Sequence, residues 1–282
     1  MQKLKQISNR ILYLPPYQET DRPILAAIVG EEKTLFIDAG NSSSHAQLFI
    51  SQLEERNISG DWLVLTHWHW DHIFGMSEFR VPIISHSMTR EKIKELQKLS
   101  WEDRDIDLRV KEGIEIPFCA NAMKIELGNQ RDILLSEPDI TFETQMELNL
   151  GGLSCVIEHV GGDHSNDSSI VYIREEKCLF IGDCLYANLY SEKWNYTIEN
   201  MLQLISKIEK YDAETFFLSH HEAPLTKEEF GSFIQLLKDA ALLTKKYKGE
   251  QEAIFREMSE RLHRGLNELE IETIDYFING FS

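Results

Sequence analysis

The chain contains little of several features that would narrow its class. Only 4 of its 282 residues are cysteines, and none of them forms a CxxC pair. We therefore expect buried free thiols rather than a zinc ribbon, a thioredoxin-like motif or a disulfide framework. No segment approaches the roughly 18 uninterrupted apolar residues of a membrane span, and the first residues do not resemble a secretion signal. These absences predict a soluble, cytoplasmic protein without a membrane partner.

Positive charge is also scarce. The 29 lysine and arginine residues face 47 aspartate and glutamate residues, which gives a formal net charge of -18 at pH 7. A field of this sign repels nucleic acid and anionic lipid, so neither is an expected partner. A small-molecule substrate is the expected partner, and nothing in the sequence indicates an oligomeric state.

Apolar residues make up 42% of the chain, enough for one large domain over residues 1–282. Short apolar runs between turns predict strands at 23–29, 34–38 and 62–65, and again at 140–152, 153–160, 168–173 and 178–183. The charged segment 88–118 lies outside this alternation and is predicted to be an insertion that covers one rim. A capping box of Thr226 and Glu229 predicts a helical C-terminal extension over 226–282.

The segment LTHWHWDH, residues 65–72, carries three of the ten histidines. In an extended chain, residues two apart point the same way, so His67 and His69 can reach one point. Once the chain turns, Asp71 and His72 face the neighbouring space. Neutral imidazole and carboxylate are ligands that zinc prefers, and this spacing therefore predicts a metal site. By contrast, His45 and His263 are expected to be solvated on helices.

THWHWDH resembles the hallmark motif of the metallo-β-lactamase superfamily, and further similar segments follow in the same order. They are FIDAG (36–40), HVGGDHSNDSSIVYI (159–173), LFIGDCLY (179–186) and FLSHHEAPLT (217–226). The resemblance covers about residues 10–225. It implies an α/β fold with four layers, an αββα sandwich of two mixed sheets flanked by helices, with metals in a cleft at one sheet edge.

The resemblance also implies a ligand set for two divalent ions. Zinc is the expected metal, with manganese and iron as alternatives. Asp38 would brace the metal loop without being a ligand. Because two histidines are adjacent at 220–221, the last ligand is ambiguous; the family's usual glycine and the position of Pro224 favour His221. The implied ligands are His67, His69 and His164 for the first ion, Asp71, His72 and His221 for the second, and Asp183 shared by both.

The function implied by the resemblance is hydrolysis of a small ester, thioester, lactone or amide. Asp71 would be the catalytic residue that orients the attacking water and can accept its proton. Three alternatives remain open. The protein could be a mononuclear-iron oxygenase resembling persulfide dioxygenases, a phosphodiesterase or nuclease of the same superfamily, or a binding module that metal stabilises without catalysis.

Overall fold

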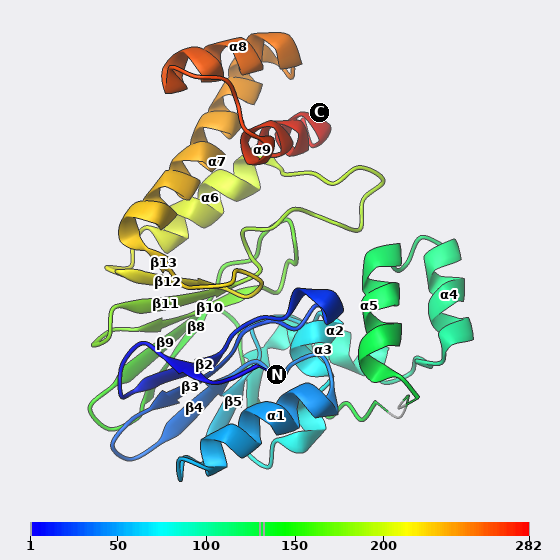
Figure 1. Cartoon of the computed structure of the whole chain (residues 1–282), viewed down its shortest axis with the longest axis vertical. Helices are drawn as coiled ribbons and strands as arrows, with labels where there is room; N and C mark the ends of the chain where they lie inside the picture. The colour runs from blue at the N-terminus through cyan, green and yellow to red at the C-terminus, as the bar shows by residue number, and fades with distance from the viewer. Residues whose placement is uncertain (1, 130, 132, 282) are drawn as a thin grey trace.

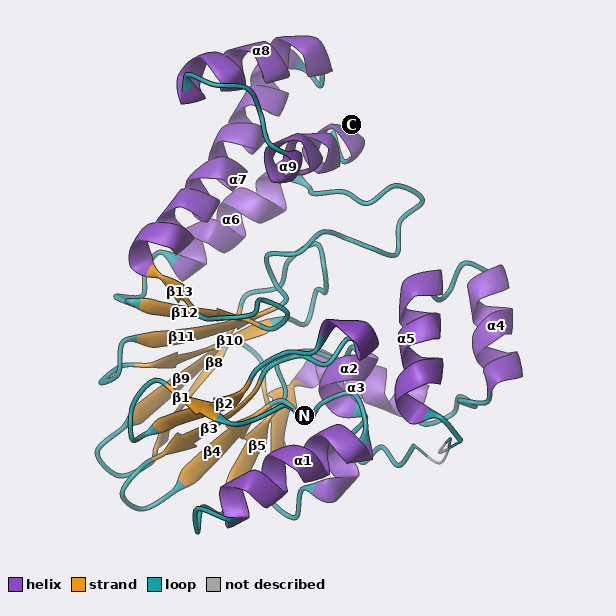
Figure 2. Ribbon diagram, in the orientation of Figure 1, coloured by secondary structure: helices purple, strands orange, loops and turns teal. Residues whose placement is uncertain are grey.

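The computed structural model describes residues 2–129, 131 and 133–281, and its strands form two sheets packed face to face (Figure 1). Helices cover the outer face of each sheet, as Figure 2 shows by element type. Three apolar clusters fill the spaces between these layers. One lies between the sheets and includes Ile28, Leu35, Ile157 and Val171. The four-layer αββα arrangement with two mixed sheets is therefore confirmed.

The first sheet joins strands in chain order, β1-β2-β3-β4-β5-β6-β7. The β4–β5, β5–β6 and β6–β7 pairs are parallel, whereas the β1–β2, β2–β3 and β3–β4 pairs are antiparallel. The run TLFI of β4 is buried at all four positions, as expected for a strand covered on both faces. The bounds are β1 Lys5–Gln6, β2 Ile11–Leu14, β3 Leu25–Val29, β4 Thr34–Ile37, β5 Trp62–Val64, β6 Ile83–His86 and β7 Ile140–Phe142.

The second sheet has the order β13-β12-β11-β10-β9-β8, and only its β11–β12 pair is parallel. The prediction of one strand over 140–152 was wrong, because this segment divides into β7 of the first sheet and β8 of the second. Edge strand β8 alternates exposed and half-buried residues, since only one of its faces is covered. The bounds are β8 Gln145–Asn149, β9 Ser154–His159, β10 Ser169–Ile173, β11 Cys178–Gly182, β12 Thr215–Leu218 and β13 Leu225–Thr226.

Helices near the first sheet include the charged segment that was predicted as an insertion. That segment is helical and extends beyond residue 118, because α5 continues to Leu127. In Figure 1, α4 and α5 stand side by side at one edge of the molecule. The bounds are η1 Gln18–Thr20, α1 Ser43–Glu54, α2 Trp70–Ile73, η2 Met76–Glu78, α3 Ser87–Leu96, α4 Asp103–Lys111 and α5 Pro117–Leu127.

Helices α6, α7, α8 and α9 cover the outer face of the second sheet and the end of the molecule beyond it (Figure 1). The predicted capping box opens α7: the Thr226 hydroxyl accepts from the Glu229 N–H, while the Glu229 carboxylate accepts from Thr226. No helix in the described ranges is long and apolar enough to cross a membrane. The bounds are α6 Ile198–Ile208, α7 Lys227–Tyr247, α8 Gln251–Leu262 and α9 Glu268–Asn279.

Candidate metal centre

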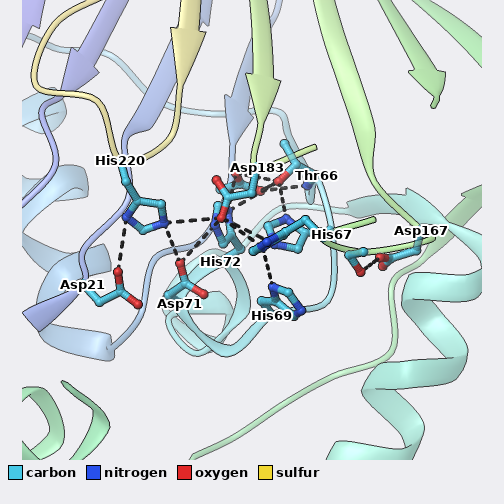
Figure 3. Close-up of polar contacts among 12 residues, drawn as sticks. Asp21, Thr66, His67, His69, Asp71, His72, Asp167, Asp183 and His220 are labelled. Carbon is cyan, nitrogen blue, oxygen red and sulfur yellow. Dashed lines mark hydrogen bonds and ion pairs between the residues drawn. The ribbon is translucent and has the colours of Figure 1, made fainter. Parts of the chain in front are cut away.

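The candidate site lies where the carboxyl ends of strands from both sheets meet (Figure 3). Strand β5 leads into the histidine motif, β11 leads into Asp183, and β12 leads into the 220–221 pair. His164 comes from the loop between β9 and β10. Gly182 has φ +61°, and a Cβ there would lie 3.2 Å from the Thr66 side chain. Glycine therefore lets β11 approach the metal motif closely and turn Asp183 toward it.

The first cluster consists of His67, His69 and His164, all buried. One ring nitrogen from each residue lies within 4.8 Å of the others. His69 Nδ1 and His164 Nε2 are 2.9 Å apart. The opposite nitrogen of His164, Nδ1, lies 3.2 Å from the carbonyl oxygen of Ala187. Because a carbonyl only accepts, Nδ1 carries the proton and Nε2 keeps its lone pair for the cluster.

The second cluster consists of Asp71, His72, Asp183 and His220. Asp71 Oδ2 is 3.1 Å from both His72 Nε2 and His220 Nε2. Asp183 Oδ2 lies 3.2 Å from His72 and 3.4 Å from His220. The same oxygen lies 3.5 Å from His164 Nε2 and 3.8 Å from His67 Nε2. One carboxylate oxygen therefore faces both clusters, which is the position that a shared ligand needs.

The last histidine of the cluster is His220, which corrects the expectation of His221. A turn begins at the end of β12, where the His221 N–H donates to the Leu218 carbonyl. This turn leaves His221 exposed, with Nδ1 at 2.7 Å from the Ala223 carbonyl oxygen. The spacing to Pro224 favoured His221, but this spacing does not determine which of the two side chains faces the cluster. That depends on the turn after β12.

Two aspartates outside the clusters lie next to the ring nitrogens of His72 and His220 that point away from the second cluster. Asp38, at φ +59°, lies 2.8 Å from His72 Nδ1 and also accepts from the Thr66 N–H and hydroxyl. This arrangement agrees with the bracing role implied for Asp38. Asp21 lies 3.4 Å from His220 Nδ1 in the same way. Sequence reasoning missed Asp21, because nothing in its local sequence indicates a contact with a residue 199 positions away.

The electrostatics of the site differ between the two clusters. Burial lowers the pKa of His67, and it lowers the pKa of His69 to about 3, so both imidazoles are neutral, as metal ligands must be. Burial also opposes charge on His72, but the carboxylates of Asp71, Asp38 and Asp183 outweigh it and raise that pKa well above its usual value. Burial and the neighbouring Asp71 raise the pKa of Asp21 to about 6. The second cluster thus attracts positive charge.

Unsatisfied atoms provide a test of whether a metal fits these residues. His67 Nε2 and Asp183 Oδ1 are buried and have no hydrogen-bond partner among the described residues. Such orphaned groups cost free energy unless a ligand satisfies them. Both belong to the clusters, and imidazole and carboxylate donors suit divalent zinc, manganese or iron. The residues of the two clusters therefore fit a dinuclear metal site.

A small cavity of about 80 Å³ opens onto the clusters. Tyr190, from the loop between β11 and α6, stands with its ring 5.6 Å from His69. Its hydroxyl donates to Glu115, which lies two residues before the start of α5. No lysine or arginine is among the cavity's described lining residues. They are Asp21, His69, Trp70, Asp71, Phe118, Cys119, His164, Asp183, Tyr186, Leu189, Tyr190 and His220.

The comparisons with known proteins agree with this geometry. The family model described as the metallo-beta-lactamase superfamily matches residues 20–220, and the chain belongs to this superfamily. Members of the superfamily are mostly metal-dependent hydrolases. A comparison with curated protein sequences found no match.

Solved structures resemble the fold at low sequence identity. A metallo-beta-lactamase from Pontibacter korlensis is 18% identical, with a TM-score of 0.60, and the match covers 83% of this chain and 98% of that one. The stereoselective inverting sec-alkylsulfatase Pisa1 from Pseudomonas sp. is 14% identical, with a TM-score of 0.64. That match covers 97% of this chain but 47% of the sulfatase, so the chain spans about half of that protein's length. At these identities the likeness concerns the fold alone.

Proposed function

We propose that the protein is a metal-dependent hydrolase that cleaves a small, uncharged ester, thioester, lactone or amide with two divalent ions, zinc by preference. The observation that carries this proposal is the position of Asp183 Oδ2, which lies within 3.8 Å of histidines from both clusters. Two sets of donors around one carboxylate are typical of sites where paired ions act on one water.

The ligand assignment follows the two clusters. His67, His69 and His164 would hold the first ion, Asp71, His72 and His220 would hold the second, and Asp183, which faces both clusters, would be available to either ion. When bound, such ions lower the pKa of a shared water toward neutrality and polarise the scissile carbonyl. Two complete donor sets favour this chemistry over that of an oxygenase with one iron and fewer ligands.

Asp71 is the catalytic residue of this proposal. It lies in α2, two residues after His69 and immediately before His72, and its side chain is almost fully buried at the cavity wall. Burial alone would raise its pKa, but His72 and His220 hold that pKa well below its usual value. The ionised carboxylate can therefore accept a hydrogen bond from the attacking water and fix its direction.

The cavity supports an uncharged substrate. Its described lining carries aromatic and carboxylate side chains but no lysine or arginine that could pair with a phosphate or carboxylate. The net charge of -18 argues against a nuclease, because it repels nucleic acid. The predicted cytoplasmic location remains a prediction.

The test joins metal analysis to a substrate panel on one preparation. Elemental analysis should give two divalent ions per chain, and a chromogenic panel of esters, thioesters, lactones and phosphodiesters should show turnover only in the uncharged classes. One iron per chain with oxygen consumption would instead indicate the oxygenase. Two bound metals without any turnover would indicate the binding module.

Asp71→Asn should lower kcat by at least about 100-fold, because removing a positioned acid–base group costs on the order of 10² to 10⁴ in rate. Glu222→Gln is the matched control, since this exposed carboxylate follows the 220–221 pair and does not line the cavity. Normal turnover by a fully metallated Asp71→Asn protein would remove Asp71 from the mechanism.

A further inference from the structure

A second and larger cavity lies beside the candidate metal centre. Its volume is about 510 Å³, within the range of small-molecule sites. The loop between β11 and α6 forms one wall, and α7, α9 and the turn between β12 and β13 form the others. Apolar and aromatic side chains dominate the lining, among them Trp194, Tyr196, Leu218, Leu225, Phe233 and Tyr276.

This second cavity adjoins the metal centre through shared residues. Tyr186 and Leu189 line both cavities. The Tyr186 ring lies 5.9 Å from the His164 ring and 6.1 Å from the His220 ring. The residues that follow β12 also contribute to both sites, because His220 belongs to the second cluster and His221 lines the second cavity. A molecule held at the metals therefore lies directly beside this apolar space.

The charges around the second cavity limit what can enter it. Glu229 and Glu272 are the carboxylates among its described lining residues, and none of these residues is lysine or arginine. Both glutamates are exposed, and each is hydrogen-bonded, Glu229 in the capping box and Glu272 to the Tyr276 hydroxyl. An anionic group would be repelled by them and find no cation to pair with.

We propose that this cavity is a specificity subsite that receives an uncharged apolar group of the substrate, of the size of a medium-length alkyl chain, while the scissile bond lies at the metals. The inference rests on the proposed hydrolase function, and it narrows the substrate to hydrophobic neutral esters, thioesters, lactones or amides. Tyr186 and Leu189, which line both cavities, would contact the substrate between its scissile bond and its apolar group. Trp194, 42% exposed on the loop, closes the outer wall.

The kinetic test compares chain lengths in two series. One varies the acyl group, from 4-nitrophenyl acetate to the octanoate, and the other varies the alcohol, from ethyl acetate to octyl acetate. In at least one series the wild type should prefer the longer substrate in kcat/KM, and Trp194→Ala should reduce that preference about tenfold, chiefly through KM, because apolar contact area is lost. Ile271→Ala is the control, since Ile271 is exposed on α9 and does not line this cavity.

The charge test uses a carboxylate at the far end of the longer chain. The wild type should turn over the ω-carboxylate at least about tenfold more slowly than the neutral substrate, and Glu272→Lys should narrow this gap by several-fold. Glu268→Lys is the matched control, one turn earlier in α9 and outside the lining. Equal effects of both lysine variants, or no preference for chain length in either series, would overturn the subsite.

A binding measurement separates failure of the subsite from failure of the hydrolase. The neutral fluorophore N-phenyl-1-naphthylamine should bind the full chain, with affinity lowered several-fold by Trp194→Ala and not by Ile271→Ala. If this pattern holds while no ester is cleaved, the hydrolase proposal fails and the apolar site stands. If the fluorophore binds both variants equally, the subsite is overturned whatever the activity.

Discussion

At the scale of single residues, two carboxylates outside the clusters help to orient histidines of the second cluster. Asp38 and Asp21 each face the outer ring nitrogen of a cluster histidine. A carboxylate in this position fixes the tautomer and the ring orientation and makes the inner nitrogen a better donor. The second cluster thus depends on two carboxylates that lie outside it.

Asp21→Asn should weaken binding of the second ion by about 10- to 100-fold, as loss of such a supporting carboxylate typically does. The first ion should be retained, because its histidines do not contact Asp21. Titration against a chromogenic chelator measures both affinities. Glu19→Gln, an exposed change two residues away, should leave both affinities at the wild-type value; an equal loss in that variant would point to a general effect on the segment.

Most of the candidate site could be predicted at this scale, because the spacing of the motif histidines and the resemblance fix six of the seven proposed ligands. The choice between His220 and His221 could not be made, since it depends on a turn that starts at the end of β12. His45 was predicted to be solvated, yet it is fully buried in α1. Its exposure depends on tertiary packing, which local sequence does not encode.

At the scale of elements, a part-buried ion pair joins α5 to the segment that carries Asp21. Glu126 on α5 accepts from the Arg22 guanidinium at 2.6 Å and from the Ser42 hydroxyl, also at 2.6 Å. Arg22 immediately follows Asp21, and α5 carries Phe118 and Cys119 of the cavity wall. This contact therefore links the position of α5 to the position of Asp21, which lies next to His220.

Glu126→Ala should lower the free energy of unfolding by about 3 kcal/mol, because it removes the only carboxylate that the largely buried Arg22 guanidinium contacts among the described residues and leaves it the neutral Gln2 alone. Urea denaturation followed by circular dichroism measures the change. Lys124→Ala on the same helix is the control: its partner Asp107 is exposed, so the loss should stay below about 1 kcal/mol. Equal losses in the two variants would mean that the Arg22 pair does not anchor α5.

Apolar runs predicted most strands, and the capping box predicted the start of α7, because those signals are local. The division of residues 140–152 between two sheets was not predictable in this way, since both halves have strand-like composition and only tertiary pairing separates them. The helical segment predicted over 88–118 extends further, because α5 continues to Leu127; that it is an insertion stays a prediction.

At the scale of the whole molecule, the metals should stabilise the fold, because the ligands come from both sheets and converge only in the folded state. Binding to the native state alone contributes about 2.7 kcal/mol at a free metal concentration roughly 100 times the dissociation constant. Removing metal with a chelator should therefore lower the melting temperature by about 5 to 10 °C.

Differential scanning calorimetry of the metallated and chelated protein measures this shift. The control is a His67→Ala, His220→Ala double variant, in which the chelator should have little effect. A wild-type melting temperature that does not respond to chelation would contradict the idea that ions tie the two sheets together.

The most direct measurement of the central claim is the metal content of two adjacent single variants, His220→Ala and His221→Ala, by elemental analysis after equilibration with limiting free zinc. The account predicts one ion per chain in His220→Ala and two in His221→Ala, as in the wild type. Two ions in His220→Ala together with one in His221→Ala would contradict the proposed centre.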